Sequence, residues 1–329
     1  MVSSLAVASS LALIWANNVL GVSAAKGVPA DTSDLTEATV PLRTHSLYGP
    51  YVDNDLQNRW WDFGADTIIN TNKGIRLTQD RPSEQGWLWS RLPLTSPNYQ
   101  IEWEFKIDSK GSNIFGDGMA MWLTKDRAQP GPVFGSKDQF YGLGVFFDTY
   151  ANTRHSYTFP RVTAMMGDGR KSYDAGTDGA QNELAGCSAN YRRTEVPTKA
   201  RLTYIRGHHL ELELHYKSWD EWTPCFKVNV TMPSSPYVGF SALTGQVSEY
   251  HDIISVTASS AVLRGENAAL MNRGRGNGHA DRHDKKTGLS WFLFMLKGIA
   301  LFALVAFGYS FYKTWAAKAR KKARMKREW

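Results

Sequence analysis

Oxygen donors of the kind that bind hard cations follow directly after a strand-like run in this sequence. In the segment VFFDTYAN, Asp148 and Asn152 stand four positions apart with a backbone carbonyl available between them. A loop that leaves a strand can wrap carboxylate, amide and carbonyl oxygens around Ca²⁺. The segment SYDAGTDG, at residues 172–179, supplies two more carboxylates, one of them Asp178. Asp and Asn beside Gly are also ordinary turn residues, so these segments indicate a cation site only when taken together.

A further polar segment precedes an apolar run. Asp117 stands between Gly116 and Gly118, immediately before the residues MAMW. Glycines on both sides leave the backbone free to bend close to a ligand. Asp117 is therefore a candidate binding carboxylate, with a simple turn as the alternative interpretation.

Paired glutamates raise another alternative, a sandwich-fold glycoside hydrolase. Such enzymes use two carboxylates that flank the scissile bond, and this chain has pairs two positions apart at Glu102 and Glu104 and at Glu211 and Glu213. In each pair an apolar residue stands where some of these enzymes place a third acid, so we interpret the glutamates as solvent-facing strand residues. The sequence also contains no Gly-x-Ser-x-Gly, His-Glu-x-x-His or phosphate-loop motif. No enzyme activity is predicted.

Short strands must position these residues. The segments 99–107 and 210–216 alternate bulky and polar residues with a period of two, which predicts strands with one buried face. Further strands are predicted over 200–206, 228–232, 237–241 and 253–258. Many short strands separated by Gly and Pro predict an all-β sandwich or barrel, in one domain that spans residues 43–260.

The positive charge of the chain is confined to its end. The net charge is +7, and residues 313–329 contain eight Lys or Arg and one acid, Glu328, so this tail accounts for the whole excess. The remaining residues are neutral overall. A polyanion-binding domain is thereby excluded, and no nucleic-acid partner is predicted.

Both ends of the chain predict passage through the secretory pathway. Residues 1–25 contain an apolar run with Ala-x-Ala-like cleavage choices, which predicts a signal peptide, with a retained anchor as the alternative. Residues 289–312 are almost wholly apolar and predict one transmembrane helix. Lys297 within it either snorkels to the lumenal surface or pairs with an acid of a partner helix. The positive-inside rule then places the tail at 313–329 in the cytoplasm, as in a single-pass type I protein.

A lumenal body leads to three further predictions and one for the tail. The sequon at Asn229 could accept a glycan. The two cysteines, Cys187 and Cys225, suggest one disulfide, the alternative being two unrelated thiols. Residues 261–288 include a polar, Gly-rich segment at 272–278, which predicts a flexible linker. The final residues KREW resemble a retrieval signal read by vesicle-coat proteins, with a polybasic stop-transfer tail as the alternative.

Several sequence blocks together resemble the intracellular L-type (leguminous-type) lectins of the secretory pathway. The opening segment HSLYGPY at 45–51 is followed in order by five further matching blocks. They are GDGMAMW (116–122), TKDRAQPGPVFGSKDQFYGLGVFFDTYAN (124–152), SYDAGTDG (172–179), ELAGC (183–187) and SEYHDIIS (248–255). So many blocks in order across residues 43–260 are far more specific than one short motif. The short linker, without a coiled-coil repeat, is most similar to the vesicular integral-membrane branch of the family.

The resemblance implies a concanavalin-like, legume-lectin β-sandwich (jelly roll) that binds mannose above its concave sheet with the help of Ca²⁺. The implied Ca²⁺ ligands are Asp148, Tyr150 through its carbonyl, Asn152 and Asp178. The implied sugar contacts are Asp117, Asn152 and Gly245, with Gln246 beside them in the same closing loop. Cys187 and Cys225 match the family disulfide. A sugar face could also stack on Tyr150 or Phe146, although each could be a core residue.

The same resemblance implies a calcium-dependent lectin of ER, ER–Golgi intermediate or Golgi membranes. Its ligands would be high-mannose N-glycans on secretory glycoproteins during cargo transport, sorting or quality control. Two departures stand out: Ala175 replaces an expected His, and the closing loop reads Gly245-Gln246-Val247. Calcium binding is therefore expected to be better preserved than sugar binding. A protein-interaction cargo receptor with an altered sugar site is the alternative function.

Overall fold

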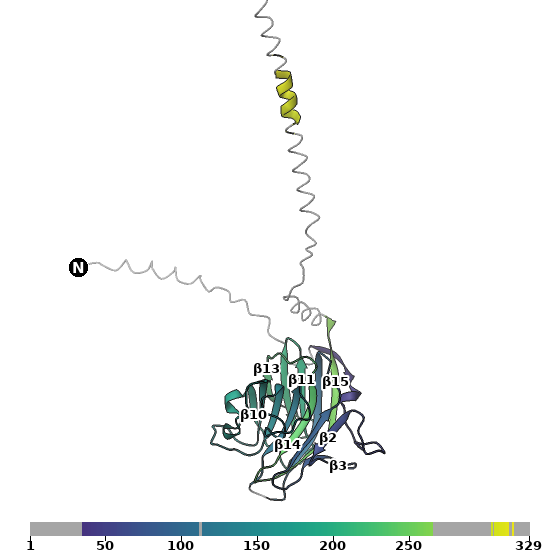
Figure 1. Ribbon diagram of the computed structural model, residues 1–329, viewed down its shortest axis with the longest axis vertical. Coiled ribbons are helices and arrows are strands. Elements are labelled where there is room, and N and C mark those ends of the chain that lie inside the picture. Colours follow the sequence, from purple (N-terminus) through teal and green to yellow (C-terminus); the bar gives the residue numbers. More distant parts are fainter. Residues whose placement is uncertain (1–34, 112–113, 266–303, 305, 316–317, 319–329) are drawn as a thin grey trace, which may run out of the picture. The chain divides into compact units, whose positions relative to one another are not determined.

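Two antiparallel β-sheets form the body of the computed structural model, which describes residues 35–111, 114–265, 304, 306–315 and 318 (Figure 1). The eight-stranded sheet contains, in spatial order, β13 (Thr223–Val228), β12 (His209–His215), β11 (Thr198–Ile205), β6 (Asn98–Asp108), β15 (Tyr250–Leu263), β4 (Gly74–Thr78) and β3 (Ile68–Asn70), with β1 (Thr36–Pro41) paired to β15. The seven-stranded sheet contains β10 (Ala185–Ser188), β9 (Arg161–Asp168), β8 (Tyr141–Asp148), β7 (Gly118–Thr124), β14 (Tyr237–Leu243), β5 (Gln85–Ser90) and β2 (Trp61–Ala65). Three short 3-10 turns complete the body: η2 (Arg43–His45), η3 (Ala175–Thr177) and η4 (Ala180–Asn182).

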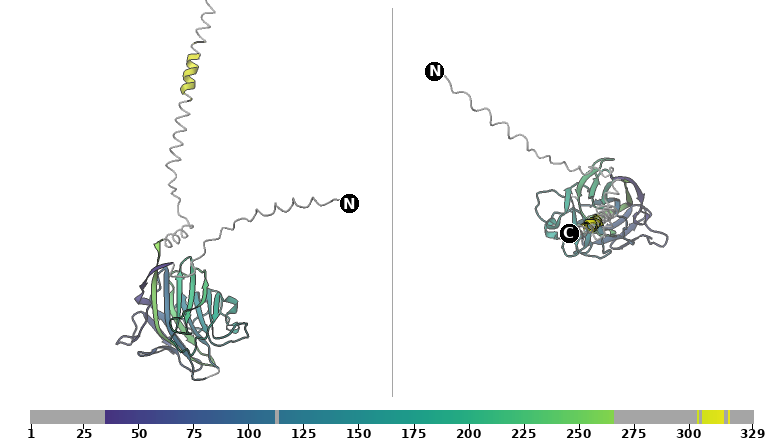
Figure 2. Two further views of the ribbon diagram at one scale, coloured as in Figure 1. Left: turned by 180° about the vertical axis from the view of Figure 1, so that it is seen from behind. Right: turned by 90° about the horizontal axis from the view of Figure 1, so that it is seen from above.

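The alternating strands bury one face each, as the sequence predicts. Along β6, the odd-numbered aromatic and aliphatic residues are buried, among them Trp103 and Phe105, while Glu102 and Glu104 between them are only partly buried. Trp103 and Phe105 both pack edge-on against Phe147 of the seven-stranded sheet. The main core therefore lies between the two sheets, and burial of these large rings is its chief stabilising contribution. Figure 2 gives the same body from behind and from above.

The seven-stranded sheet is covered on both of its faces. All seven residues of β7 are buried, and successive side chains of a strand point to opposite faces. Met121 of β7 belongs to the main core, whereas Trp122 belongs to a second cluster with Phe134 and Phe140. These two rings come from the chain between β7 and β8, which folds over the outer face of this sheet. A near-continuous apolar strand is the sequence pattern that such double burial requires.

The disulfide joins the edges of the two sheets. Cys187 in β10 and Cys225 in β13 are bonded, with a Cα–Cα separation of 5.2 Å. Both strands stand last in the order of their sheets. The predicted pairing is confirmed, and it connects two edges that share no backbone hydrogen-bond ladder.

The strand boundaries differ from the sequence prediction in two places. The sandwich begins at β1 and continues to the end of β15 at Leu263, so it extends beyond both predicted limits, 43 and 260. The strand predicted over 228–232 is wrong, because β13 ends at Val228. β13 was not predicted because it contains Pro224, and proline within a strand is tolerated mainly on edge strands and at bulges. β13 is such an edge strand, and its pairing with β12 shifts register between Leu212 and Glu213.

The chain divides into two units, Met1–Gly274 and Arg275–Trp329. The predicted signal peptide at 1–25 and most of the linker and tail lie outside the described residues. Of the predicted transmembrane segment at 289–312, the described part includes helical residues from 306 onward. Within the described residues, no helix is both long enough and apolar enough to cross a bilayer.

Removal of the disulfide should destabilise the body. The bridge closes a loop with a sequence separation of 38 residues, and a cross-link of that span contributes about 2–4 kcal/mol, mainly by restricting the unfolded chain. We expect the double variant C187A/C225A to lose about that much free energy of unfolding, measured by urea denaturation. Under reducing conditions the wild type and the variant should unfold at the same urea concentration. Equal stability under oxidising conditions would contradict the prediction.

Candidate functional site

Strand register brings three loop segments to one edge of the seven-stranded sheet. β7 pairs with β8 so that Gly118 faces Asp148, and with β14 so that Gly118 also faces Leu243. Because both pairings are antiparallel, the residues before β7 lie beside the residues after β8 and after β14. Asp117, the segment from Asp148 onward and the closing loop at Gly245 therefore meet at this edge.

Asp117 presents a half-buried carboxylate at this meeting point. Its N–H donates to the carbonyl of Leu243 at 3.3 Å, and its carbonyl accepts the N–H of Thr149 at 3.1 Å. The carboxylate lies against Gly245, where an added Cβ would stand 3.1 Å from Oδ2. In the described part of the chain, no donor is bonded to this carboxylate. Burial raises the pKa of Asp117; nearby His251 lowers it and nearby Glu249 raises it further.

Asp148 and Asp178 form a pair of buried carboxylates. The two residues are only 4% and 2% exposed. Burial, followed by the charge of Asp178, holds the pKa of Asp148 well above its usual range. Asp148 accepts the N–H of Tyr150 at 3.1 Å, and the hydroxyl of Tyr173 lies 3.5 Å from its other oxygen. Two like charges in a water-poor site favour a positive charge between or beside them.

Asp178 is surrounded by donors from the loop between β8 and β9. Oδ1 accepts the side-chain amide of Asn152 at 2.7 Å, and the backbone N–H of Asn152 lies 3.1 Å from both oxygens. Oδ2 accepts from Nε2 of His155 at 2.6 Å. An ionised carboxylate can only accept, so we assign a hydrogen to Nε2. The predicted partners Asn152 and Asp178 are therefore in contact.

The donor set fits a hard cation. Asp148, Asp178, the amide oxygen of Asn152 and the carbonyl of Tyr150 are all oxygen donors, which is the chemistry that Ca²⁺ prefers. Across the described ranges, no cluster of three or more His, Cys, Asp or Glu side chains is arranged to hold a metal. The amide and the backbone carbonyl would therefore have to complete the site.

Three further predicted residues lie in three different surroundings. Tyr150 is 38% exposed, and its Cβ lies against Gly116, so its ring stands at the rim of the site. Phe146 is buried in the second core cluster between Phe134 and Trp122, so of its two interpretations the core residue is confirmed and sugar stacking is wrong. Gln246 is exposed in the closing loop.

A buried ion pair behind the site was not anticipated from the sequence. Glu249 is fully buried; its Oε2 accepts Nε of Arg192 at 2.7 Å, while Oε1 accepts from Thr149 Oγ1 and lies 3.2 Å from His251 Nε2. The guanidinium of Arg192 also lies 3.3 Å from the ring centroid of Phe115. The pair thus ties together the segments that carry Asp117, Asp148 and the closing loop. In the sequence, the only sign of this ion pair was the charge of Glu249, which stands directly before β15.

The glutamates of the hydrolase alternative lie elsewhere and are paired. Glu102 accepts from Nε and an Nη of Arg201 at 3.1 and 3.0 Å across the β6–β11 ladder. Glu211 is bridged to Lys227 at 3.2 Å across the β12–β13 ladder. These contacts are cross-strand ion pairs of the eight-stranded sheet. The glutamates lie on strands, as the sequence interpretation had them, but they are partly buried, and Glu102 and Glu211 are paired.

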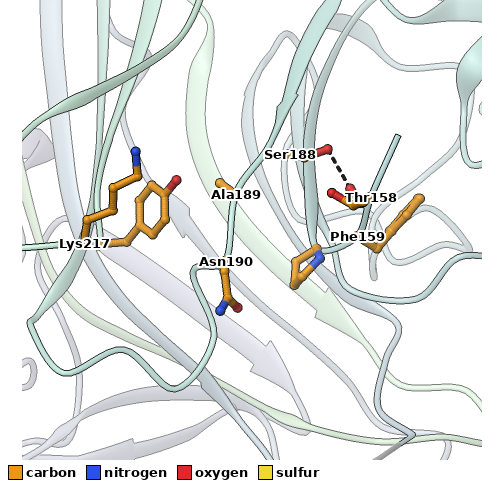
Figure 3. A pocket seen from close by; sticks show the side chains of 8 residues that line it. Thr158, Phe159, Ser188, Ala189, Asn190 and Lys217 are labelled. Atoms are coloured by element: carbon orange, nitrogen blue, oxygen red, sulfur yellow. Dashed lines mark hydrogen bonds between the residues drawn. The ribbon is translucent and has the colours of Figure 1, made fainter. Parts of the chain in front are cut away.

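A hollow of about 560 Å³ lies among the chain before β9, the end of β10 and the chain after β12 (Figure 3). Its lining includes Phe159 before β9, Asn190 after β10 and Lys217 after β12, and Ser188 donates to the carbonyl of Thr158 on its wall. No residue predicted to bind metal or sugar lines it. The candidate site is thus a loop surface at the sheet edge, separate from this hollow.

Replacing Glu249 should test the buried pair. The change E249Q leaves the Arg192 guanidinium buried without its counter-charge, which we expect to lower the free energy of unfolding by about 3–5 kcal/mol. The matched control E102Q breaks a partly exposed pair and should change it by less than about 1 kcal/mol. Urea denaturation measures both. Similar effects for the two variants would contradict the assigned role of Glu249.

Comparison with known proteins places these features in one family. The family model described as "Legume-like lectin family" matches residues 37–266. An L-type lectin-like domain-containing protein of Schizosaccharomyces pombe is 41% identical over 220 residues, which cover 66% of this chain and 70% of that protein. The human vesicular integral-membrane protein VIP36 is 38% identical over 231 residues, which cover 68% of this chain and 64% of that protein.

Solved structures agree with the fold. The lumenal domain of VIP36 in a form bound to Ca²⁺ and Man3GlcNAc has a TM-score of 0.63 at 38% identity, covering 67% of this chain and 89% of that one. The metal-free form of the same domain also has a TM-score of 0.63, at 36% identity, with 68% and 99% covered. The VIP36 lumenal domain has been solved with a bound glycan, Man3GlcNAc, and the matching family is one of lectins, so the hydrolase alternative is excluded. On the sequence match and the shared sandwich, the chain belongs to the legume-like lectin family.

Proposed function

We propose that this protein is a calcium-dependent lectin that binds mannose-containing N-glycans at the loop edge of the seven-stranded sheet. One observation carries the proposal: the half-buried Asp117 carboxylate has no donor among the described residues and stands against Gly245. An acceptor in that position is suited to sugar hydroxyls, because charged acceptors form the stronger hydrogen bonds. The relatives support the ligand, since VIP36 has been solved with Ca²⁺ and with mannose, Man2 or Man3GlcNAc.

Each residue of the edge would have a distinct role. Asp117 would accept hydrogen bonds from two neighbouring hydroxyls of one mannose, and Gly245 would leave room for the ring to approach. Asn152 would direct its side-chain amide toward the same sugar. A bound Ca²⁺ would neutralise Asp148 and Asp178 and hold the Asn152 loop in place. The exposed ring of Tyr150 could cover an apolar face of the sugar.

Affinity for a single glycan should be low. Sugar hydroxyls exchange bonds to water for bonds to protein with a small net gain, and the edge is a shallow surface. Clustered glycans on one cargo protein would therefore bind more tightly through avidity.

The setting that we propose is the membrane system between the ER and the Golgi. The cross-linked cysteines are typical of an oxidising compartment, and relatives carry the name vesicular integral-membrane protein. A single-pass type I chain would place the sandwich, and Asn229 with its sequon, in the lumen. Its basic tail would face the cytoplasm and vesicle coats. Transport, sorting or quality control of glycoproteins fits that placement.

A second candidate is a cargo receptor that recognises protein surfaces through an altered sugar site. Ala175 favours it, because this residue is exposed in η3 and its methyl group offers no hydrogen bond. Capture of cargo that persists after complete deglycosylation would support this candidate over the lectin.

The Asp117 carboxylate provides the main test. Asn at this position keeps the shape but removes the charge, and a charged hydrogen-bond partner is worth about 1.5–3 kcal/mol. We expect D117N to weaken binding to high-mannose glycans about 10- to 100-fold, measured on a glycan array with and without EDTA. The control D220N, in the β12–β13 hairpin, should bind like the wild type. Binding that is insensitive to both D117N and EDTA would rule out the assigned site.

Gly245 allows sugar and calcium binding to be separated. In G245A the new methyl group would stand 3.1 Å from Asp117 Oδ2, in the space assigned to the sugar. We expect weaker mannose binding with unchanged Ca²⁺ affinity, because none of the proposed Ca²⁺ ligands touches that methyl. Isothermal titration with each ligand measures the two effects. Loss of both affinities together would show that the two halves are not separable.

A further inference from the structure

His155 contacts the buried carboxylate of Asp178 from a position that the family resemblance did not point to. Its Nε2 lies 2.6 Å from Asp178 Oδ2, and the two side chains are 9% and 1% exposed. The residue belongs to the loop between β8 and β9, three positions after Asn152. A hydrogen bond to a carboxylate in so dry a place is strong, because water does not compete for either partner.

The His155 ring is held by a row of flat side chains. It stacks on Tyr157 with centroids 4.5 Å apart and planes within 11°, and Phe159 lies 5.7 Å away. Tyr157 is itself fixed, since the guanidinium of Arg161 lies 3.8 Å from its centroid and Arg161 is paired with Glu183. Rotation of the imidazole would disrupt this stack. Its N–H is therefore a fixed donor.

The two oxygens of Asp178 share the backbone N–H of Asn152, but their side-chain partners differ in mobility. Oδ2 is bonded to the fixed imidazole, whereas Oδ1 is bonded to the side chain of Asn152, which is exposed. An exposed amide can turn without disturbing any packed neighbour. A cation that approaches the Asp148–Asp178 pair can therefore replace the Asn152 N–H on Oδ1 while His155 retains Oδ2.

We propose that His155 is a positioning residue for the calcium site, whose Nε2–H fixes the Asp178 carboxylate with Oδ1 directed toward the ion. This inference rests on the proposed calcium-dependent function. Ala175, which stands where the resemblance leads us to expect a His, has no side-chain N–H. His155 provides an imidazole N–H from a different loop. Hydrogen bonds that orient metal-binding side chains commonly change metal affinity 10- to 100-fold, so His155 affects how tightly this chain holds Ca²⁺.

Two substitutions separate the donor from the stack. H155F keeps a flat ring beside Tyr157 but removes the N–H, whereas H155Q removes the ring but keeps a side-chain N–H of similar reach. Titration of the full chain with CaCl₂, followed by calorimetry, should give about 10- to 100-fold weaker binding for H155F and near wild-type binding for H155Q. The control H208Q, in the turn between β11 and β12, should leave Ca²⁺ affinity unchanged. Thermal unfolding in EDTA establishes that each variant is folded.

Opposite results would overturn the inference. If H155Q loses calcium and H155F retains it, His155 serves only to pack the loop. If H155F binds Ca²⁺ as tightly as the wild type or more tightly, the imidazole does not help the site or competes with the ion. If the wild type itself binds no Ca²⁺ while the glycan array is positive, the calcium part of the proposed function fails together with this inference. If the wild type binds Ca²⁺ and both His155 variants bind it equally well, the inference about His155 is wrong while the proposed function stands.

Discussion

The burial of two like charges at one sheet edge is the constraint on which the site depends. Asp148 and Asp178 are almost excluded from water, and ionised carboxylates in such a place require donors or a cation. The loop between β8 and β9 meets that requirement by turning its N–H groups inward, from Tyr150 to Asp148 and from Asn152 and His155 to Asp178. The path of this loop, which has no strand or helix of its own, therefore follows from the carboxylates that it must satisfy.

The sheets determine where those carboxylates can be. β7 is buried on both faces between β8 and β14, and a slip of one residue would reverse every side chain of such a strand. Its register is thereby fixed, and with it the contact of Asp117 with Thr149 and Gly245. The buried Glu249–Arg192 pair reinforces the same junction from behind, since Thr149 donates to Glu249. Strand register and one ion pair together hold three loops to a single geometry.

Much of this could be predicted from the sequence where the signal is local. Alternation revealed β6 and β12; an oxygen donor beside glycine revealed Asp117 and Asp178 as candidates, and one directly after a strand-like run revealed Asp148. Contacts made only in three dimensions were missed. Nothing in the spacing of His155 shows that its ring would reach Asp178, and nothing near Glu249 identifies Arg192 as its partner. Phe146 was left open between sugar stacking and core for the same reason, because only the segment that folds over the outer face of β7 decides that this ring is core.

The two halves of the edge are supported in different ways, which bears on the two residues that stood out as departures in the sequence, Ala175 and Gln246. Asp148 and Asp178 are buried and bonded to several groups, so substitution of either would leave donors such as His155 without a partner. The side chains of Ala175 and Gln246 are exposed and are not part of the core, so other residues at these positions would leave the fold intact. Substitution at Ala175 or Gln246 is therefore tolerated by the fold, whereas substitution in the carboxylate pair is not. Under the proposed function, a different glycan preference would thus need no change in the carboxylate pair and its donors.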